Sequence, residues 1–292
     1  MKVGQSIKER FEQGKPLFSV EFFPPKDDAG GERMLKTASQ IQPHNPDFVS
    51  ITYGAGGGTR ETTMRYARLL KEEHGFEVMP HLTCVGHTRE ELLEILEEFA
   101  EAGFRNVMAL RGDPPKGETT FKPVPGGLSY GSDLVSLIRE NFPDFGIGVG
   151  GYPEKHPEAS DAKKDLEHLK IKVDAGADFI TTQLFFDNAV YFDFVDRCRT
   201  SGISLPVLPG LLPVLSIGQV RRFCAMCEAT LPVELEHGLD RAEESMQPKV
   251  GADWALSQTK SLLDGGAPGY HLYALNKSAS TLRILEGLQA TG

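Results

Sequence analysis

A cation, a glycine and an anion follow a short apolar run near the middle of the sequence. The run, residues 106–110, has the length expected of a buried strand. Arg111, Gly112 and Asp113 come next, and the two prolines after them exclude further sheet or helix. The sequence therefore predicts that Arg111 and Asp113 stand at a strand end, a position better suited to chemistry than to packing. The alternative is a turn in which these two charges pair with each other.

The same change from apolar to polar residues recurs along the whole chain. Short apolar runs, expected to be strands, occupy residues 17–22, 48–52, 78–82, 106–110, 146–150, 179–182, 207–211 and 271–275. Amphipathic patterns of helical period occupy residues 32–41, 60–73, 89–102, 133–141, 161–175, 189–200, 217–229 and 278–288. Polar or titratable side chains stand at the ends of nearly all these strands: Glu21, Thr52, Tyr53, His81, Arg111, Asp113, Tyr152, His156, Gln183, Asn276 and Lys277.

Eight strand-then-helix units predict an α/β fold in which a parallel sheet closes on itself, a (β/α)8 TIM barrel. An open doubly wound sheet is the alternative. A long segment between the seventh and eighth strands, about residues 231–269, is expected to be an insert with extra helix, including residues 253–263. Without repeats or linkers, the sequence predicts one domain over residues 1–292. Catalytic groups of such barrels lie at the carboxyl ends of the strands.

The composition is typical of a soluble globular enzyme, with 40% hydrophobic and 25% charged residues. The formal net charge of -10 argues against nucleic acids and anionic membranes as partners, because both need a basic face. No apolar segment resembles a secretion signal or a membrane span. Four cysteines indicate a reduced, cytoplasmic setting. Cys224 and Cys227 form a C-x-x-C pattern in a helical run, and without a second pair we interpret them as core rather than as a metal site.

Residues 146–151 match the pattern G-x-G-x-x-G letter for letter. A dinucleotide fingerprint requires a strand before the glycines and a helix that opens directly on them. Here the glycines fall within the expected strand, and the following YPEKHP segment cannot start a helix. The sequence therefore predicts no Rossmann site, and the glycines are expected to let a flat group approach the barrel wall.

Taken together, these segments closely resemble the bacterial-type 5,10-methylenetetrahydrofolate reductases, which are flavoenzymes built on a (β/α)8 barrel. The matching segments follow the family order over nearly the whole chain. They are residues 19–26 (SVEFFPPK), 48–55 (FVSITYGA), 80–84 (PHLTC), 109–115 (ALRGDPP), 152–158 (YPEKHPE), 182–187 (TQLFFD) and 273–277 (YALNK). The resemblance implies FAD as cofactor, NADH or NADPH as reductant, a folate substrate and a homo-oligomer. Since the chain ends at Gly292, we expect no C-terminal regulatory domain of the kind that long eukaryotic members carry.

The resemblance also implies roles for two carboxylates. Glu21 matches the family's general acid, and its flanking phenylalanines are expected to raise the pKa of the carboxyl. The alternative is a strand carboxylate paired with a nearby cation. Asp113 matches a catalytic carboxylate between flavin and folate, where it hydrogen bonds the pterin and tunes the flavin.

Further residues match the family's flavin contacts. For Asp165 and Lys172 the alternative is a solvated helix face, and for His156 it is a turn histidine. Lys172 is placed to favour negative charge on the reduced ring, and Tyr152 is expected to lie against the isoalloxazine. The full set of expected cofactor contacts is Thr52, Tyr53, Ala55, His81, Arg111, Gly112, Asp113, Gly131, Tyr152, His156, Ala159, Asp165 and Lys172.

A second set matches the substrate contacts of the family. Besides Asp113, Gln183 matches a residue that contacts both folate and nicotinamide, and Gln219 and Lys277 match folate contacts. Gln219 also fits a capping box that starts at Ser216, and both roles stay open. Phe223 matches an aromatic that stacks on the alternating substrates, although the alternative is a helix-core phenylalanine.

Four positions depart from the family pattern. Gly131, His168, Ile171 and Lys277 stand where other members tend to have Ala, Asn, Arg and Arg. Ile171 cannot bind a phosphate, so the adenosine end of FAD is expected to be held differently. Lys277 keeps the charge of arginine but loses its bidentate fork.

The implied reaction reduces 5,10-methylenetetrahydrofolate to 5-methyltetrahydrofolate in two half-reactions on one FAD face, a step that feeds methionine synthesis. Two other functions stay open. A barrel lyase or aldolase would use a Schiff-base lysine, but none of the eight expected strands contains a lysine. A folate-binding relative without turnover is the other alternative, against which the presence of both Glu21 and Asp113 argues.

Overall fold

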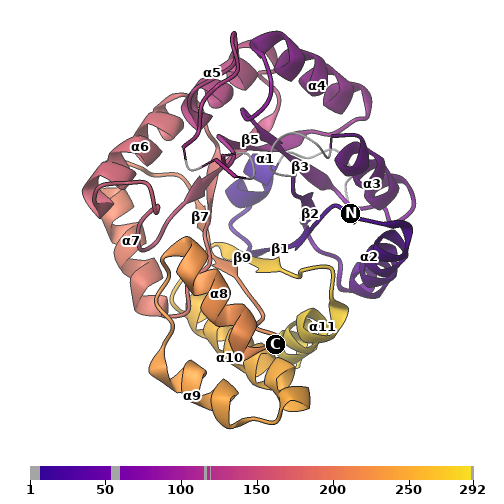
Figure 1. Ribbon diagram of the computed structural model, residues 1–292, viewed down its shortest axis with the longest axis vertical. Coiled ribbons are helices and arrows are strands. Elements are labelled where there is room, and N and C mark those ends of the chain that lie inside the picture. The colour runs from indigo at the N-terminus through magenta and orange to yellow at the C-terminus, as the bar shows by residue number, and fades with distance from the viewer. Residues whose placement is uncertain (1–6, 54–59, 115–116, 119, 291–292) are drawn as a thin grey trace.

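A ring of parallel strands surrounded by helices forms the body of the computed structural model (Figure 1). The structure describes residues 7–53, 60–114, 117–118 and 120–290. All strand pairs are parallel, as the repeated strand–helix units predict. The strands are β1 (Leu17–Phe22), β2 (Phe48–Ile51), β3 (Val78–Thr83), β4 (Asn106–Leu110), β5 (Gly146–Gly151), β6 (Phe179–Thr182), β7 (Val207–Leu208), β8 (Gly210–Leu211) and β9 (Gly269–Tyr273).

The expected seventh strand is split in two at Pro209. Its first half, β7, pairs with β6, and its second half, β8, pairs with β9. Proline has no backbone N–H to give to a ladder, whereas the Pro209 carbonyl accepts from the His271 N–H at 2.9 Å. This short segment thereby joins the two ends of the sheet, so the barrel is nearly closed and the open doubly wound sheet is excluded.

The helices lie outside the strands, as in other (β/α)8 folds (Figure 1). The Thr88–Glu91 capping box forms as expected, and the Ser216 hydroxyl accepts from the Gln219 N–H. The helices are α1 (Ile7–Glu12), α2 (Asp28–Ile41), α3 (Arg60–Glu72), α4 (Arg89–Glu101), α5 (Gly131–Asn141), α6 (Ala162–Asp174), α7 (Asn188–Thr200), α8 (Ile217–Cys227), α9 (Val233–Arg241), α10 (Gln247–Asp264) and α11 (Ser278–Gln289). Between β8 and β9 the chain thus carries α8, α9, the short 3-10 helix Glu244–Met246 and α10.

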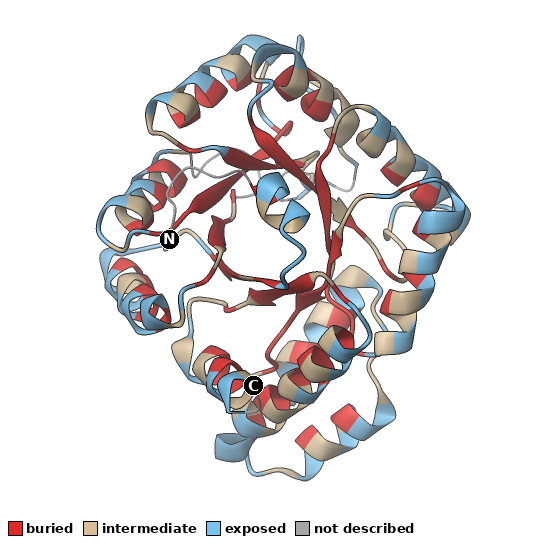
Figure 2. Cartoon of the chain, turned by 180° about the vertical axis from the view of Figure 1, so that it is seen from behind, coloured by how far each residue is buried: buried red, intermediate tan, exposed pale blue. Residues whose placement is uncertain are grey.

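Helix α1 was not expected from the sequence, and Figure 2 shows it across the centre of the ring, at the amino ends of the strands. The Ile7 N–H donates to Asn106 Oδ1 at 2.9 Å, and Arg10 pairs with Asp47. Ile7 and Phe11 pack on the apolar side chains that fill the barrel at this end. At six residues the helix is too short for periodicity to reveal it, and tertiary contacts such as these stabilise it.

The barrel interior changes from apolar to polar along its axis. Alternate residues of a strand point to the same face, so the inward column of β1 is Leu17, Ser19 and Glu21. Near α1 the interior holds a cluster of Ile7, Leu17, Phe48, Met79, Met108, Phe179 and Leu208. Toward the carboxyl ends the inward positions are occupied by buried Ser19, Glu21, Ser50, His81, Thr83, Thr181 and His271.

Phe179 belongs to the apolar cluster inside the barrel near α1, where its ring contacts those of Phe11 and Phe48. We expect Phe179→Ala to lower the free energy of unfolding by about 3–5 kcal/mol, because the close-packed barrel cannot collapse around the cavity. Ile171→Ala, which truncates an exposed apolar side chain on α6, is the control and should change it by less than about 0.5 kcal/mol. Urea unfolding followed by circular dichroism measures both.

Strand β5 contains all the glycines of the G-x-G-x-x-G pattern, and the next helix along the chain, α6, begins only at Ala162. This confirms that the pattern is not a dinucleotide-binding turn. Cys224 and Cys227 both lie in α8 as free thiols, packed against the apolar cluster under that helix. Over the described ranges, no three His, Cys, Asp or Glu side chains gather as metal ligands, and no helix is long and apolar enough to cross a bilayer.

Candidate functional site

Glu21 is the buried carboxyl of the polar half of the barrel. Three side chains from three other strands converge on its Oε2 atom. The Ser50 hydroxyl donates to Oε2 at 3.1 Å, and His271 Nε2 lies 3.3 Å away in a second hydrogen bond. His81 Nε2 lies at the same distance of 3.3 Å but in a geometry that makes no hydrogen bond. These contacts within the described residues thus all fall on one oxygen of the carboxyl.

The environment of Glu21 differs from the apolar one expected from its neighbours in sequence. Phe22 points to the opposite face of β1, into the layer under the helices, and Phe23 is partly exposed beyond the strand. Burial raises the pKa of the Glu21 carboxyl, but the close polar contacts of His271 and His81 with Oε2, together with the charges of both histidines, outweigh burial and lower that pKa to about 2. The expectation of a raised pKa was therefore wrong, because the strand alternation directs the phenylalanines away from the carboxyl.

This lowered pKa makes a prediction about acid stability. A carboxyl whose pKa is lower in the folded than in the unfolded state stabilises the fold above its unfolded pKa of about 4.5, and this contribution is lost as the pH falls toward about 2. We expect the free energy of unfolding to fall less steeply between about pH 5 and pH 3 in Glu21→Gln than in the unmodified protein. Urea unfolding at a series of pH values tests this, and equal slopes would contradict it.

Strand β5 is uncrowded at Gly150, toward the same end of the barrel as Glu21. A methyl group built on Gly148, at the apolar level, would come within 2.7 Å of the Phe179 ring, whereas one on Gly150 would meet only Leu110 Cδ2 at 3.7 Å. The interior toward this end of the barrel also holds three fully buried polar atoms with no hydrogen-bond partner among the described residues: His81 Nε2, Thr83 Oγ1 and Thr181 Oγ1. Buried polar atoms are rarely left unpaired, so the upper barrel is chemically suited to a flat polar group such as a flavin ring.

Arg111 and Asp113 follow β4 at the same end of the barrel, but they do not form the expected alternative pair with each other. The two terminal guanidinium nitrogens of Arg111, Nη1 and Nη2, donate to Glu158 at 2.6 and 2.7 Å, in a bidentate pair. Gly112 allows this turn, since its φ is 89° and a Cβ there would lie 2.8 Å from Val85 Cγ1. Asp113 is exposed at the rim, free to contact a ligand.

The loop after β5 is folded by its own polar groups. His156 Nδ1 accepts from the Glu158 N–H at 3.0 Å, and Asp165 accepts from the His156 N–H at 3.1 Å. The Ala159 N–H donates to the His156 carbonyl. The ring of Tyr152 lies edge-on to His156, with centroids 4.5 Å apart. His156 is thus the turn histidine of the alternative interpretation, and burial lowers the pKa of its ring.

Lys172 does not lie on a solvated face of α6. Its Nζ donates to the Gly150 carbonyl at 2.6 Å, directly behind the open space on β5. Burial lowers the pKa of Lys172 to about 8, although Asp165 acts in the opposite direction. The alternative for Lys172 and Asp165, a solvated helix face, was therefore wrong, because α6 turns this face toward the sheet.

The remaining expected cofactor contacts lie around the same mouth. Thr52 directly follows β2, and the Tyr53 hydroxyl lies 3.0 Å from His87 Nε2. Burial raises the pKa of Tyr53 to about 12. A Cβ on Gly131, the first residue of α5, would lie 3.3 Å from the backbone nitrogen of Arg111. Ala55 lies outside the described residues.

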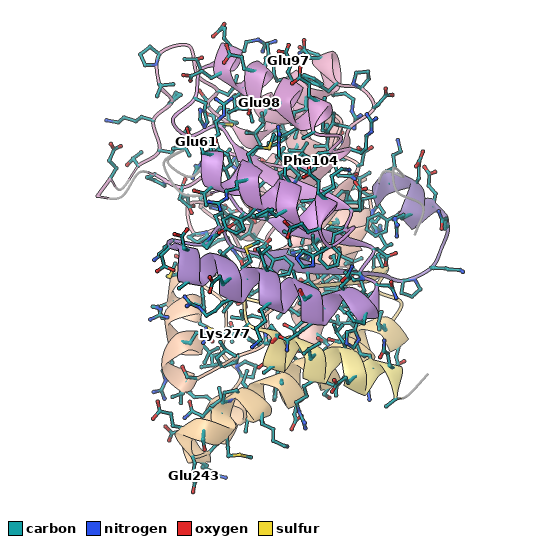
Figure 3. The ribbon with its side chains drawn as sticks, turned by 90° about the vertical axis from the view of Figure 1, so that its right-hand side faces the viewer. Glu61, Glu97, Glu98, Phe104, Glu243 and Lys277 are labelled. Carbon is teal, nitrogen blue, oxygen red and sulfur yellow. The ribbon has the colours of Figure 1, made fainter. Side chains whose placement is uncertain are left out.

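The expected substrate contacts border the mouth from the side of β6, α8 and α11. Gln183 Oε1 accepts from the Leu184 N–H, and Gln219 Oε1 accepts from the Leu215 N–H at 2.9 Å. Gln219 therefore has a capping role, although its partner is the residue before the box. Phe223 is partly buried in the cluster under α8. Lys277 is exposed, and Figure 3 places it toward the end of the barrel away from α1.

Two hydrogen bonds and an ion pair tie the segment after α8 to the loop after β5. Glu154 accepts from both the Thr230 N–H and its hydroxyl, at 2.7 and 2.6 Å, and Lys155 pairs with Glu228 at 3.2 Å. Electrostatic effects connect the same side: besides burial, Asp113 raises the pKa of Tyr152 and of Cys227. Burial and Glu21 likewise raise the pKa of Tyr273. Glu21 and Asp113 thus lie at the same mouth of the barrel, Glu21 in its interior and Asp113 at its rim.

Sequence reasoning missed several polar groups of this site. Ser19, Ser50, Thr83, Thr181 and His271 lie within strands, where only strand ends were searched for functional residues. Alternation along each strand would have placed them on the inner face with Glu21. Glu158, the partner of Arg111, is 47 residues away in sequence and had no local signal.

Comparison with known proteins assigns a family. Residues 6–289 match the family model described as methylenetetrahydrofolate reductase. Methylenetetrahydrofolate reductase (NADH) 1 of Arabidopsis thaliana is 39% identical over 300 residues, which cover 99% of this chain and 51% of the relative. 5,10-methylenetetrahydrofolate reductase of Pectobacterium carotovorum is 39% identical over 291 residues, 98% of this chain and 94% of the relative. The chain therefore spans about half the length of the plant protein.

Among solved structures, an uncharacterized protein from Clostridium thermocellum that binds two copies of 5-methyl-5,6,7,8-tetrahydrofolic acid is similar in fold. The TM-score is 0.67 and the identity 15%, over 98% of both chains. At this identity the likeness concerns the fold alone. The family model and the closer sequence relatives carry the assignment: the chain belongs to the methylenetetrahydrofolate reductase family.

Proposed function

We propose that this protein reduces 5,10-methylenetetrahydrofolate to 5-methyltetrahydrofolate with a reduced nicotinamide, using FAD. The observation that carries the proposal is the position of Glu21, a buried carboxyl held at Oε2 toward the same end of the barrel as the uncrowded Gly150. An acid and a surface for a flat ring at one end of a barrel suit a reaction that opens a folate ring while reducing it. Family membership supports the same substrate.

FAD, when bound, would supply the hydride chemistry that no amino-acid side chain provides. The surfaces suited to hold it are the open face of Gly150, the unpaired polar atoms around it and the loop from Tyr152 to Asp165. Lys172 would act through the Gly150 carbonyl, where its positive charge favours extra negative charge on a ring above the strand.

Glu21 would protonate N10 of the substrate as the five-membered ring opens. The methylene carbon then becomes an electrophile at N5, ready to accept hydride, so the acid must act where the hydride arrives. Asp113, exposed on the rim, would accept hydrogen bonds from the pterin. Gln183 would contact folate and nicotinamide in turn. Lys277, Gln219 and Phe223 border the side on which the rest of the folate would lie.

Purification of the full chain tests the proposal directly. We expect a yellow protein whose flavin absorbance is bleached anaerobically by NADH or NADPH and restored by 5,10-methylenetetrahydrofolate. Stopped-flow reduction with each nicotinamide identifies the reductant. A colourless protein that borohydride links covalently to a substrate would instead indicate a Schiff-base lyase, and a colourless protein that binds folate without turnover would indicate a binding protein. We also expect the protein to be a cytoplasmic homo-oligomer. Analytical sedimentation of the purified protein measures its oligomeric state.

A further inference from the structure

Three side chains form a buried line through the barrel that ends at Glu21. In the pairing of β1 with β9, Ser19 lies opposite His271, and Glu21 lies opposite Tyr273. Ser19 Oγ lies 2.7 Å from His271 Nδ1, and His271 Nε2 lies 3.3 Å from Glu21 Oε2. Ser19 is fully buried and His271 is 1% exposed. The imidazole therefore has one partner on each ring nitrogen.

The serine can serve either charge state of the imidazole. A hydroxyl donates one hydrogen bond and accepts two. When His271 is neutral with its proton on Nε2, Ser19 can donate to Nδ1. When His271 is charged, Nδ1–H can donate to Ser19 instead. His271 thus keeps Nδ1 paired with Ser19 whether or not Nε2 carries a proton.

The groups that face Glu21 come from every strand packed against it. β2 contributes the Ser50 hydroxyl and β3 contributes His81. β9 contributes His271 and Tyr273, whose hydroxyl donates to the Thr182 carbonyl at 2.6 Å. Of the titratable groups, only His271 hydrogen bonds to the carboxylate within the described part of the chain. His81 is close enough for an ion pair but has its Nε2 unpaired.

We propose that His271, held by Ser19, is a positioning residue that stores the proton Glu21 delivers, so that the acid of the reaction is the Glu21–His271 pair. This inference rests on the proposed function, since it concerns how that reaction obtains its proton. The pair holds one proton between Nε2 and Oε2. A lone carboxylic acid would have lost this proton well below neutral pH, and the imidazole nitrogen gives the pair a second atom that can hold it.

The proton balance of the pair is simple. The N–H bond of the imidazolium breaks as the O–H bond of Glu21 forms, which leaves a neutral imidazole and a carboxylic acid. The O–H bond then breaks as the substrate N–H bond forms at N10. The pair ends as a carboxylate beside a neutral His271 that keeps its proton on Nδ1 and donates it to Ser19. Nε2 then regains one proton from solvent before the next turnover.

The decisive variant is His271→Gln, because the glutamine amide can keep an N–H near the position of Nε2 but cannot store a proton. In both proteins the rate of the folate half-reaction of pre-reduced enzyme should fall above a threshold pH. We expect this threshold to be at least about one unit lower in His271→Gln than in the unmodified protein. Well above the threshold, the variant should react at no more than about one tenth of the unmodified rate. Tyr270→Phe is the control on the same strand, since Tyr270 points away and stacks on Phe18, and it should leave the profile unchanged.

An infrared measurement tests the same pair without turnover. The C=O band of the protonated Glu21 carboxyl is assigned by its absence in Glu21→Gln. In the unmodified protein the band should be absent down to about pH 4, because the histidines lower the pKa of Glu21 to about 2. In His271→Gln it should appear above about pH 4. The carboxyl titration and the rate profile thus move in opposite directions, which a merely structural role would not produce.

If His271→Gln keeps the rate profile and the infrared spectrum of the unmodified protein, or lowers the rate equally at every pH, the inference is overturned. Ser19→Ala gives a second test should the first variant fold poorly, and a smaller shift in the same directions is expected. A protein without any reductase activity would refute the proposed function instead. The infrared result would still decide whether Glu21 and His271 share a proton.

Discussion

Glu21→Gln should abolish reduction of the folate while leaving reduction of the enzyme by the nicotinamide nearly unchanged. Only the first of these steps needs a proton donor, and loss of a general acid lowers a rate by about 10²–10⁴-fold. Glutamine keeps the size of the side chain and can still accept from Ser50, so the barrel should remain folded. Anaerobic stopped-flow absorbance, with each half-reaction started separately, measures the two rates.

The matched control is Glu77→Gln, which removes a second buried carboxyl from the opposite end of the barrel. Glu77 precedes β3, accepts from Asn106 Nδ2 at 3.0 Å, and has its pKa raised by burial. Both half-reactions of this variant should match those of the unmodified protein. If Glu21→Gln slowed both half-reactions equally, its effect would be on cofactor placement, and the role of Glu21 as acid would have to be abandoned.

Gly150→Leu should yield a folded protein that retains little or no flavin. The open space over Gly150 is where we place the ring, and a leucine side chain would occupy it from the barrel wall. Because the first added carbon meets only Leu110 Cδ2 at 3.7 Å, the substitution should not strain the protein itself. We expect at least about a tenfold loss of flavin affinity, equivalent to about 1.4 kcal/mol, measured by the absorbance of the purified protein and by flavin titration.

A graded series separates this effect from misfolding. Gly150→Ala adds a single methyl group and should weaken flavin binding less than leucine does. Gly148→Leu, two residues earlier on the same face, would collide with the ring of Phe179 and should destabilise the fold itself. If Gly150→Leu bound flavin normally with an unchanged unfolding midpoint, the ring would have to lie elsewhere in the mouth.

Local patterns in the sequence determined the elements and their order. Apolar runs bounded by turn residues placed the strands within one or two residues, because burial on both faces of a parallel strand leaves a continuous apolar signature. The Thr88 box and the glycines at 103, 176 and 202, all with positive φ, marked helix ends for equally local reasons. Repetition of strand and helix was then sufficient to predict the barrel.

The residue-by-residue assignment of the mouth came from the family resemblance rather than from such patterns, and the roles assigned to those residues stay predictions. Physical reasoning from neighbours in sequence failed for Glu21, because Phe22 lies on the other face of the strand. It also failed for Lys172, whose partner is a carbonyl of another element. In both cases the side chain's environment is set by which strand or helix packs beside it.

The sequence by itself thus determined the eight strand–helix units and their order, since these follow from short-range periodicity and turn chemistry. Only the tertiary structure decided which side chains meet. Ser19 and His271 are 252 residues apart, and Arg111 and Glu158 are 47 apart, yet each pair forms a hydrogen bond. Such contacts depend on strand register around the whole barrel, and no local stretch of residues contains that information.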